Sequence, residues 1–145
     1  MNQKFYPLRA SENFLSFQFE SQSEERTIAK AVELVRIGVN VYNLAFGDLA
    51  EHGDLNDQVV SNNGDMHKIL ATVAQAIILF FKAYPGEQVY FTGSSPARTR
   101  LYRAILNRER ENWSMVFEVK GVLNGEPIPF KSSSDYDGFL VSCKK

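Results

Sequence analysis

Apolar and polar residues alternate along several stretches of the 145-residue chain, and this alternation predicts β-strands. In residues 14–20, for example, Leu15, Phe17 and Phe19 alternate with polar side chains. A last strand or an extended tail is expected near the C-terminal end, at residues 136–143. Alternation, or enrichment in β-branched and aromatic residues, predicts the other strands at residues 39–46, 88–92, 115–122 and 126–130.

Two other segments carry their apolar residues at helical spacing. In residues 65–84 these residues recur every three or four positions, and a Pro-Gly pair follows, which predicts a helix about 30 Å long. A second helix is expected from Pro96 to about Arg110, with Ser95 as its N-cap, because proline is well tolerated at the first helical position. The inward face of this second helix is expected to carry Leu101, Ala104 and Ile105.

Residues 27–37 fit both periods. The spacing of Ile28, Ala31, Val32 and Val35 suits a helix, whereas apolar or long side chains at positions 28, 30, 32 and 34 suit a strand. The short connection around Gly38 favours a strand that pairs antiparallel with residues 39–46. We therefore predict a single α+β domain over residues 1–145, a mostly antiparallel sheet with two helices in the order β-β-β-α-β-α-β-β, with the C-terminal segment as an additional strand or tail.

Composition narrows the class of protein. The content of 44% hydrophobic and 23% charged residues is typical of a compact domain, which we expect to fold without a cofactor. The first residues lack the apolar core of a secretory signal, so we expect a cytoplasmic protein. The longest apolar stretch, residues 69–81, is shorter than the about 20 residues that span a bilayer, and no membrane association is expected. Cys143 is the single cysteine, which excludes an internal disulfide.

Charge is distributed unevenly along the chain. Residues 1–72 carry six Lys and Arg against ten Asp and Glu, whereas residues 73–145 carry ten against seven. The resulting net charges of −4 and +3 nearly cancel in the overall value of −1. A balance of this kind does not indicate a protein that binds nucleic acid through its bulk charge, so any anion site must be local.

Such a local site is predicted at the start of the second helix. A helix N-terminus presents unsatisfied N–H groups and a partial positive charge, and first-turn carboxylates often offset that charge. Here no acidic residue lies between Glu87 and Glu109, and Arg98 and Arg100 occupy the first turn. The segment lacks the second glycine and the lysine of a Walker loop. The candidate anion-binding residues are Ser94, Ser95, Arg98, Arg100 and Arg103.

The same helix is expected to carry a basic face. Arg100, Arg103, Asn107 and Arg110 are spaced by three, four and three residues, which places them on one side of a helix. Contact with successive phosphates of a nucleic acid, or with one polyphosphate, is the functional interpretation. The alternatives are a solvated face, or arginines that pair with the acidic loop of the chain itself.

That acidic loop follows the strand predicted at residues 39–46. Its carboxylates could hold a cation, but their spacing is not that of an EF-hand, and the neighbouring glycines suit turns, so no metal is predicted. If one of them acted on a phosphate held by Arg98 or Arg100, the chain would be a nuclease or a phosphotransfer enzyme. The loop residues in question are Asp48, Asp54, Asp57 and Asp65.

Three sequence blocks also resemble a known family. They are YNLAFGD at residues 42–48, SNNGD at residues 61–65 and GSSPARTRLYR at residues 93–103. Together they resemble a family of small bacterial proteins described as a domain of unknown function, and the resemblance implies a stand-alone bacterial domain but no activity. Three hypotheses follow. The first is a protein that binds a phosphate-bearing ligand, such as a nucleotide or nucleic acid; the others are an enzyme acting on phosphate and a protein–protein interaction module that offers a strand edge.

Overall fold

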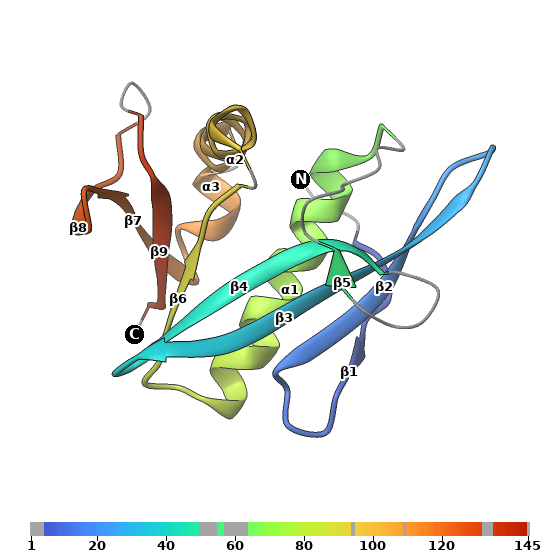
Figure 1. Ribbon diagram of the computed structural model, residues 1–145, viewed down its shortest axis with the longest axis horizontal. Helices are drawn as coiled ribbons and strands as arrows, with labels where there is room; N and C mark the ends of the chain where they lie inside the picture. Colours follow the sequence, from blue (N-terminus) through green and yellow to red (C-terminus); the bar gives the residue numbers. More distant parts are fainter. Residues whose placement is uncertain are drawn as a thin grey trace. The chain divides into compact units, whose positions relative to one another are not determined.

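The computed structural model describes residues 5–49, 55–56, 64–93, 95–108, 110–131 and 135–144 (Figure 1). Backbone contacts group the chain into two compact units. Unit 1 comprises Met1–Val35 and Ala45–Pro85, and unit 2 comprises Arg36–Leu44 and Gly86–Lys145. Strands β3 and β4, defined below, each contribute residues to both units.

The structure confirms the predicted α+β class and the order of its main elements. Among the described residues these elements are β1 (Arg9–Ala10), β2 (Ser16–Gln22), β3 (Thr27–Gly38), β4 (Val41–Leu49), β5 (Leu55–Asn56), α1 (Met66–Ala83), β6 (Gln88–Phe91), α2 (Pro96–Arg108), α3 (Arg110–Trp113), β7 (Phe117–Leu123), β8 (Glu126–Pro129) and β9 (Gly138–Cys143). The strands are hydrogen-bonded in the order β1-β2-β3-β4-β6-β9-β7-β8, with β5 beside β4. The sheet is mixed, because β4 and β6 are parallel whereas pairs such as β2/β3 and β7/β9 are antiparallel.

In unit 1, the segment with two plausible periods forms strand β3. It pairs antiparallel with β2, with Ser16 opposite Glu33 and Gln22 opposite Thr27. Buried side chains lie at alternate positions along its core-facing side, namely Lys30, Val32 and Leu34. The strand period therefore prevails, as predicted, and β4 is the other neighbour of β3 in the sheet.

Helix α1 supplies much of the core of unit 1 and lies behind β3 in the view of Figure 1. Its apolar residues follow the helical spacing that the sequence predicts, and the side chain of Ile77 is 5% exposed. By length and hydropathy alone α1 would also suffice to cross a membrane, a test that the core helix of a globular protein passes equally. The buried residues of α1 are Ile69, Thr72, Val73, Ala76, Ile77, Phe80 and Phe81.

In unit 2, β6 and β9 lie at the centre of a group of strands that ends at β8. The start of β4 runs parallel to β6, with Val41 opposite Gln88. The hairpin between β7 and β8 turns at Asn124 and Gly125, whose φ angles of 53° and 80° are those of the Asn-Gly turn that the sequence predicts. This edge of the sheet ends in β8, where two prolines remove backbone donors.

Helix α2 buries a different face from the one predicted. Thr99, Tyr102 and Ile105 are its buried residues, whereas Leu101 is 43% exposed and Ala104 is also exposed. The prediction was therefore correct for Ile105 and wrong for Leu101 and Ala104. The inward stripe follows positions three residues apart because the Tyr102 ring packs against Phe91 of β6, with ring centroids 6.1 Å apart.

Candidate anion-binding site at the start of α2

The turn from β6 into α2 is closed by a set of short hydrogen bonds. The Ser95 hydroxyl oxygen accepts a hydrogen bond from the Arg98 N–H at 3.2 Å, which confirms Ser95 as the N-cap. The Thr99 hydroxyl accepts a bond from the Gly93 N–H at 3.0 Å and lies 3.2 Å from the Ser95 carbonyl oxygen. These contacts hold the turn against the first turn of the helix, so its position relative to α2 is well defined.

Gly93 is required for this turn by lack of space. A Cβ atom at this position would lie 2.5 Å from the Thr99 backbone nitrogen and 2.6 Å from the Arg98 Cβ. Both distances are far below van der Waals contact, and one of the two atoms belongs to the helix backbone. Only glycine therefore allows the strand to approach the start of α2 this closely.

Two arginines near the start of α2, Arg98 in its first turn and Arg100 at the beginning of its second, are the main feature of the site. Arg100 is exposed and Arg98 is half-buried, and the first turn contains no acidic residue. Arg98 is hydrogen-bonded to Tyr102; burial raises the pKa of the Tyr102 hydroxyl, and the Arg98 guanidinium partly opposes that rise. In the part of the chain that the structure describes, neither Arg98 nor Arg100 forms an ion pair. Their charges thus add to the positive end of the helix dipole without local compensation.

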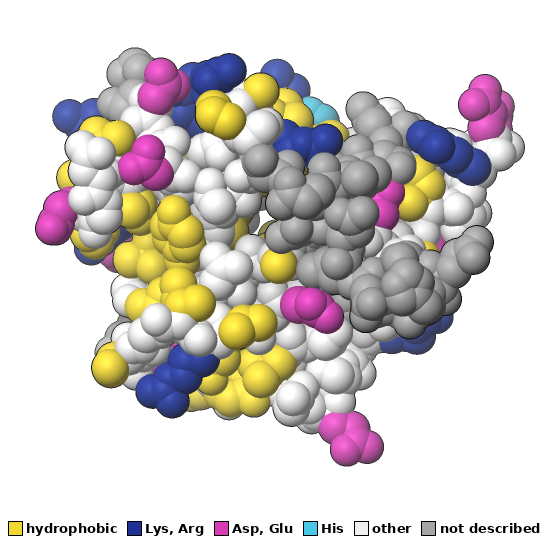
Figure 2. All heavy atoms as spheres, in the orientation of Figure 1, with side chains coloured by type: hydrophobic (Ala, Val, Ile, Leu, Met, Phe, Trp, Pro, Cys, Tyr) yellow, Lys and Arg dark blue, Asp and Glu magenta, His cyan; other side chains and the backbone are white. Residues whose placement is uncertain are grey.

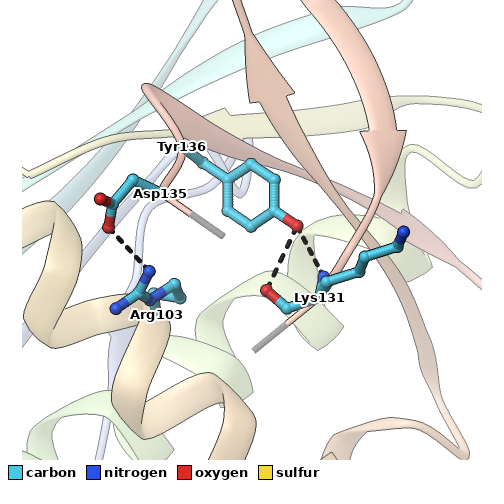
Figure 3. Close-up of polar contacts among 4 residues, drawn as sticks. All are labelled: Arg103, Lys131, Asp135 and Tyr136. Atoms are coloured by element: carbon cyan, nitrogen blue, oxygen red, sulfur yellow. Dashed lines mark hydrogen bonds and ion pairs between the residues drawn. The ribbon is translucent and has the colours of Figure 1, made fainter. Parts of the chain in front are cut away.

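Arg103, one turn further along α2, is paired. Its Nη1 lies 2.7 Å from Asp135 Oδ1, and the two side chains are 21% and 75% exposed, respectively (Figure 3). For the arginines of this helix the sequence left open a solvated face or pairing with the acidic loop; Arg103 pairs with Asp135, which lies outside that loop. Asp135 is distant in sequence and has no pattern that would mark it as a partner, so the sequence analysis did not identify it.

Tyr136 fixes the segment that carries Asp135. Its hydroxyl accepts a hydrogen bond from the Lys131 N–H at 2.6 Å and lies 3.3 Å from the Lys131 carbonyl oxygen (Figure 3). The same hydroxyl lies 3.1 Å from the Pro129 carbonyl oxygen. The ring lies directly on β7, where a Cβ atom added to Gly121 would be 2.2 Å from ring carbons. The buried tyrosine therefore positions the exposed carboxylate that engages Arg103.

The two described members of the acidic loop, Asp48 and Asp65, are both bonded to other side chains. Asp48 Oδ1 lies 2.6 Å from Nζ of Lys30, whose side chain is completely buried. Asp65 accepts hydrogen bonds from the hydroxyls of Tyr6 and, at 2.6 Å, Ser21. Both described carboxylates are thus bonded within unit 1. The other predicted residues of the two sites, Ser94, Asp54 and Asp57, lie outside the described residues.

The sequence analysis also missed an aromatic groove at the far end of α2. The Arg110 guanidinium carbon lies 5.0 Å from the ring centroid of Phe130 and 5.9 Å from that of Trp113, which are distances of cation–π contact. Arg110 also donates a hydrogen bond to the Phe130 carbonyl oxygen at 3.2 Å. The predicted basic face identified Arg110, but only the fold brings Trp113 and Phe130 beside it.

Exposed positions do follow the predicted basic face. Arg100, Asn107 and Arg110 are exposed, and the paired Arg103 is half-buried between them. Figure 2 shows dark blue Lys and Arg side chains around the position of α2 at the top of the view. The face is therefore cationic at both ends and neutralised by Asp135 in the middle.

Comparison with known proteins gives one result. No curated protein and no solved structure matches the chain. A family profile matches residues 2–144, nearly the whole sequence, and its description is that of a family of unknown function. By this match the chain belongs to the family of unknown function DUF6934.

Proposed function

We propose that this protein binds a phosphate-bearing ligand, a nucleic acid or a nucleotide, at the start of α2. The observation that carries the proposal is the pair of arginines in the first five residues of α2, Arg98 and Arg100, which have no ionic partner among the described residues. A cation without an ionic partner at the positive end of a helix raises the local electrostatic potential, and a bound phosphate lowers it.

The donors at this position suit a phosphate. The Arg100 guanidinium can donate two parallel hydrogen bonds to one phosphate group. The Ser95 hydroxyl uses its oxygen to cap the Arg98 N–H, and among the described residues no acceptor takes its proton, which is therefore available to a phosphate oxygen. Pro96 has no N–H, so the side chains contribute more of the expected contacts than the helix amides do.

An enzymatic function has less support. A phosphotransfer or nuclease mechanism on this chain would need a carboxylate that is free to act as a base. Asp48 and Asp65, the two described members of the acidic loop, are instead committed to Lys30, Tyr6 and Ser21. Binding without catalysis is accordingly our proposal.

A second candidate is protein–protein interaction through the β3–β4 hairpin. Apolar side chains on this hairpin are turned to solvent, with Ile37 58% exposed and Val39 82% exposed. The ladder between β2 and β3 ends at Glu33, so the last residues of β3 extend beyond it. An extended apolar edge of this kind is suited to strand addition.

An NMR titration tests the phosphate proposal. Phosphate, a nucleotide and a short RNA are each added at low salt, and the amide shifts are expected to be largest for Ser95–Arg100 and to shrink as salt is raised. Arg98→Ala combined with Arg100→Ala is expected to abolish these shifts. The matched control, Arg9→Ala with Lys82→Ala, removes the same charge from unit 1 and is expected to keep them. Shifts that are absent, or that spread evenly over the protein, contradict the proposal.

A further inference from the structure

The groove at the end of α2 is an open cavity of about 370 Å³ that lies wholly in unit 2. Its apolar lining comes from Trp113, Phe117, Val119 and Phe130, and its size is within the range of sites that bind small molecules or single bases. Trp113 is held in place by a hydrogen bond from its indole N–H to the Leu106 carbonyl oxygen at 2.7 Å. The aromatic surface is therefore anchored to the last turn of α2.

The charge around this groove is mainly positive. Arg110, Lys120 and Lys144 line it together with a single carboxylate, that of Glu118. Lys120 Nζ is 3.8 Å from Glu118 Oε1, a long and exposed contact that neutralises little. Lys144 donates to the Ser114 carbonyl oxygen at 2.8 Å, which holds its ammonium beside the groove without cancelling its charge. An occupant with an apolar, planar part and a negative charge is complementary to this surface.

We propose that the groove is a base-stacking subsite for single-stranded nucleic acid. A base stacks on the Trp113, Phe130 and Arg110 surface, and the phosphates of the same strand lie along the exposed cations of α2. This inference rests on the proposed function, and it specifies the ligand as a single strand with its bases available. Proteins that bind single strands without sequence preference combine these two elements, a cationic track for the backbone and aromatic rings for the bases.

The dimensions of α2 suit this arrangement. Its 13 residues correspond to about 20 Å at the rise of an α-helix, with Arg98 and Arg100 at one end and the groove at the other. A strand of several nucleotides spans such a length, and site sizes of about 4–16 nucleotides are usual for single-strand binding domains. A duplex is not expected to bind in this way, because its bases are stacked on one another and are not available to the groove.

Trp113 is the single tryptophan of the chain, so its fluorescence reports on the groove alone. The experiment compares a DNA single strand of about ten nucleotides with an abasic strand of the same length, which keeps the phosphates and lacks the bases. We expect the base-bearing strand to quench Trp113 and to bind about 5- to 150-fold more tightly, the factor that one stacked base contributes. The abasic strand is expected to bind through α2 and to leave the fluorescence unchanged.

The other outcomes separate the two proposals. Equal binding and equal fluorescence with both strands overturn the groove proposal and leave the phosphate proposal standing. Binding of neither strand overturns both. An affinity for the base-bearing strand that is unchanged in the Arg98→Ala, Arg100→Ala variant contradicts both proposals, because the phosphates of the strand then do not lie at the start of α2. Quenching by an acidic peptide with an aromatic residue, but not by the DNA strand, overturns the groove proposal in favour of a protein ligand.

Two variants complete the test. Phe130→Leu keeps the groove apolar and removes one ring, and it is expected to abolish the preference for the base-bearing strand. Phe5→Leu, which alters an exposed aromatic ring of unit 1, is the control and is expected to keep that preference. If circular dichroism shows that Phe130→Leu is unfolded, Arg110→Gln provides the same comparison with all rings in place. A folded variant that retains the full preference overturns the proposal.

Discussion

The two units of this protein use charge in opposite ways. Unit 1 carries a net charge of −4 and unit 2 a net charge of +3. In unit 1 two of the described carboxylates, those of Asp48 and Asp65, turn towards buried Lys30, Ser21 and Tyr6, whereas Glu12, Glu20, Glu24 and Glu25 are exposed. In unit 2 Arg98, Arg100 and Arg110 turn towards solvent or an aromatic surface.

This difference shows that net charge alone does not locate a binding surface. Buried ionic groups must find partners, because transfer from water without them is costly, and they are then unavailable to a ligand. Burial and the hydrogen bond to Asp65 raise the pKa of the Tyr6 hydroxyl. Tyr6 therefore stays protonated and donates its hydrogen bond to the Asp65 carboxylate. Exposed charges have no such requirement, and we propose that the exposed cations of α2 exchange water for phosphate.

The largest loss of stability is expected when the ion pair between Lys30 and Asp48 in unit 1 is broken. Asp48→Ala leaves the Lys30 ammonium buried without this carboxylate and is expected to lower the free energy of unfolding by about 3–5 kcal/mol. Chemical denaturation measures the loss. The double variant Lys30→Met with Asp48→Leu removes both charges and is expected to recover most of it. A loss below about 1 kcal/mol in the single variant would show that the pair is not a structural requirement.

Removal of core volume from unit 1 is expected to have a similar or smaller effect. Ile77 is 5% exposed on the buried face of α1, and Ile77→Ala is expected to lower the free energy of unfolding by about 2–5 kcal/mol through the cavity that it leaves. Leu70→Ala, at a half-buried position of the same helix, is the control and should cost less. Equal losses for the two variants would contradict the orientation of α1.

In unit 2 the packing of the core is tested by adding a methyl group at Gly121, where Tyr136 lies on β7. A methyl group there collides with the Tyr136 ring, so Gly121→Ala is expected to lower the free energy of unfolding by about 1–3 kcal/mol. Thermal melting measures the change. Gly86→Ala, where an added Cβ meets nothing, serves as the control. An unchanged melting temperature for Gly121→Ala would mean that the ring does not lie on β7.

The cap of α2 has a smaller expected contribution. Ser95→Ala removes the hydrogen bond to the Arg98 N–H and is expected to lower the free energy of unfolding by about 1 kcal/mol. Ser95→Asp restores an acceptor and is expected to recover the stability, while its charge weakens phosphate binding. Identical melts of Ser95→Ala and the wild type would show that the cap contributes nothing.

The smallest effect on stability is expected for substitution of Arg100. Arg100 is exposed and forms no ion pair within the described residues, so Arg100→Ala is expected to change stability by no more than about 0.5 kcal/mol. The affinity of the Arg100→Ala variant for phosphate is nevertheless expected to fall. Denaturation and the NMR titration, applied to the same variant, measure the two properties. A large loss of stability would place Arg100 among the structural charges, as in unit 1.

Local patterns in the sequence were sufficient for most of the fold. The strand period identified β2 and β7, enrichment in β-branched and aromatic residues identified β4, and the spacing of apolar residues identified α1. The Ser95 cap and the Asn124-Gly125 turn were also predicted correctly, because each depends on contacts between neighbours in the chain. The buried face of α2 was not predicted correctly, since Leu101 and Ala104 fit the helical period but are exposed in the structure.

Contacts between distant segments were decided by the tertiary structure alone. The sequence marks Lys30 as a position on a strand face, yet only the pairing of the strands buries it beside Asp48. In the same way Arg103 and Arg110 are evident in the sequence, whereas Asp135 beside Arg103 and Phe130 beside Arg110 come from 20 or more positions away. Spacing along the chain records the conformation of a segment, but the identity of its neighbours depends on the chain folding back on itself, which no local pattern encodes.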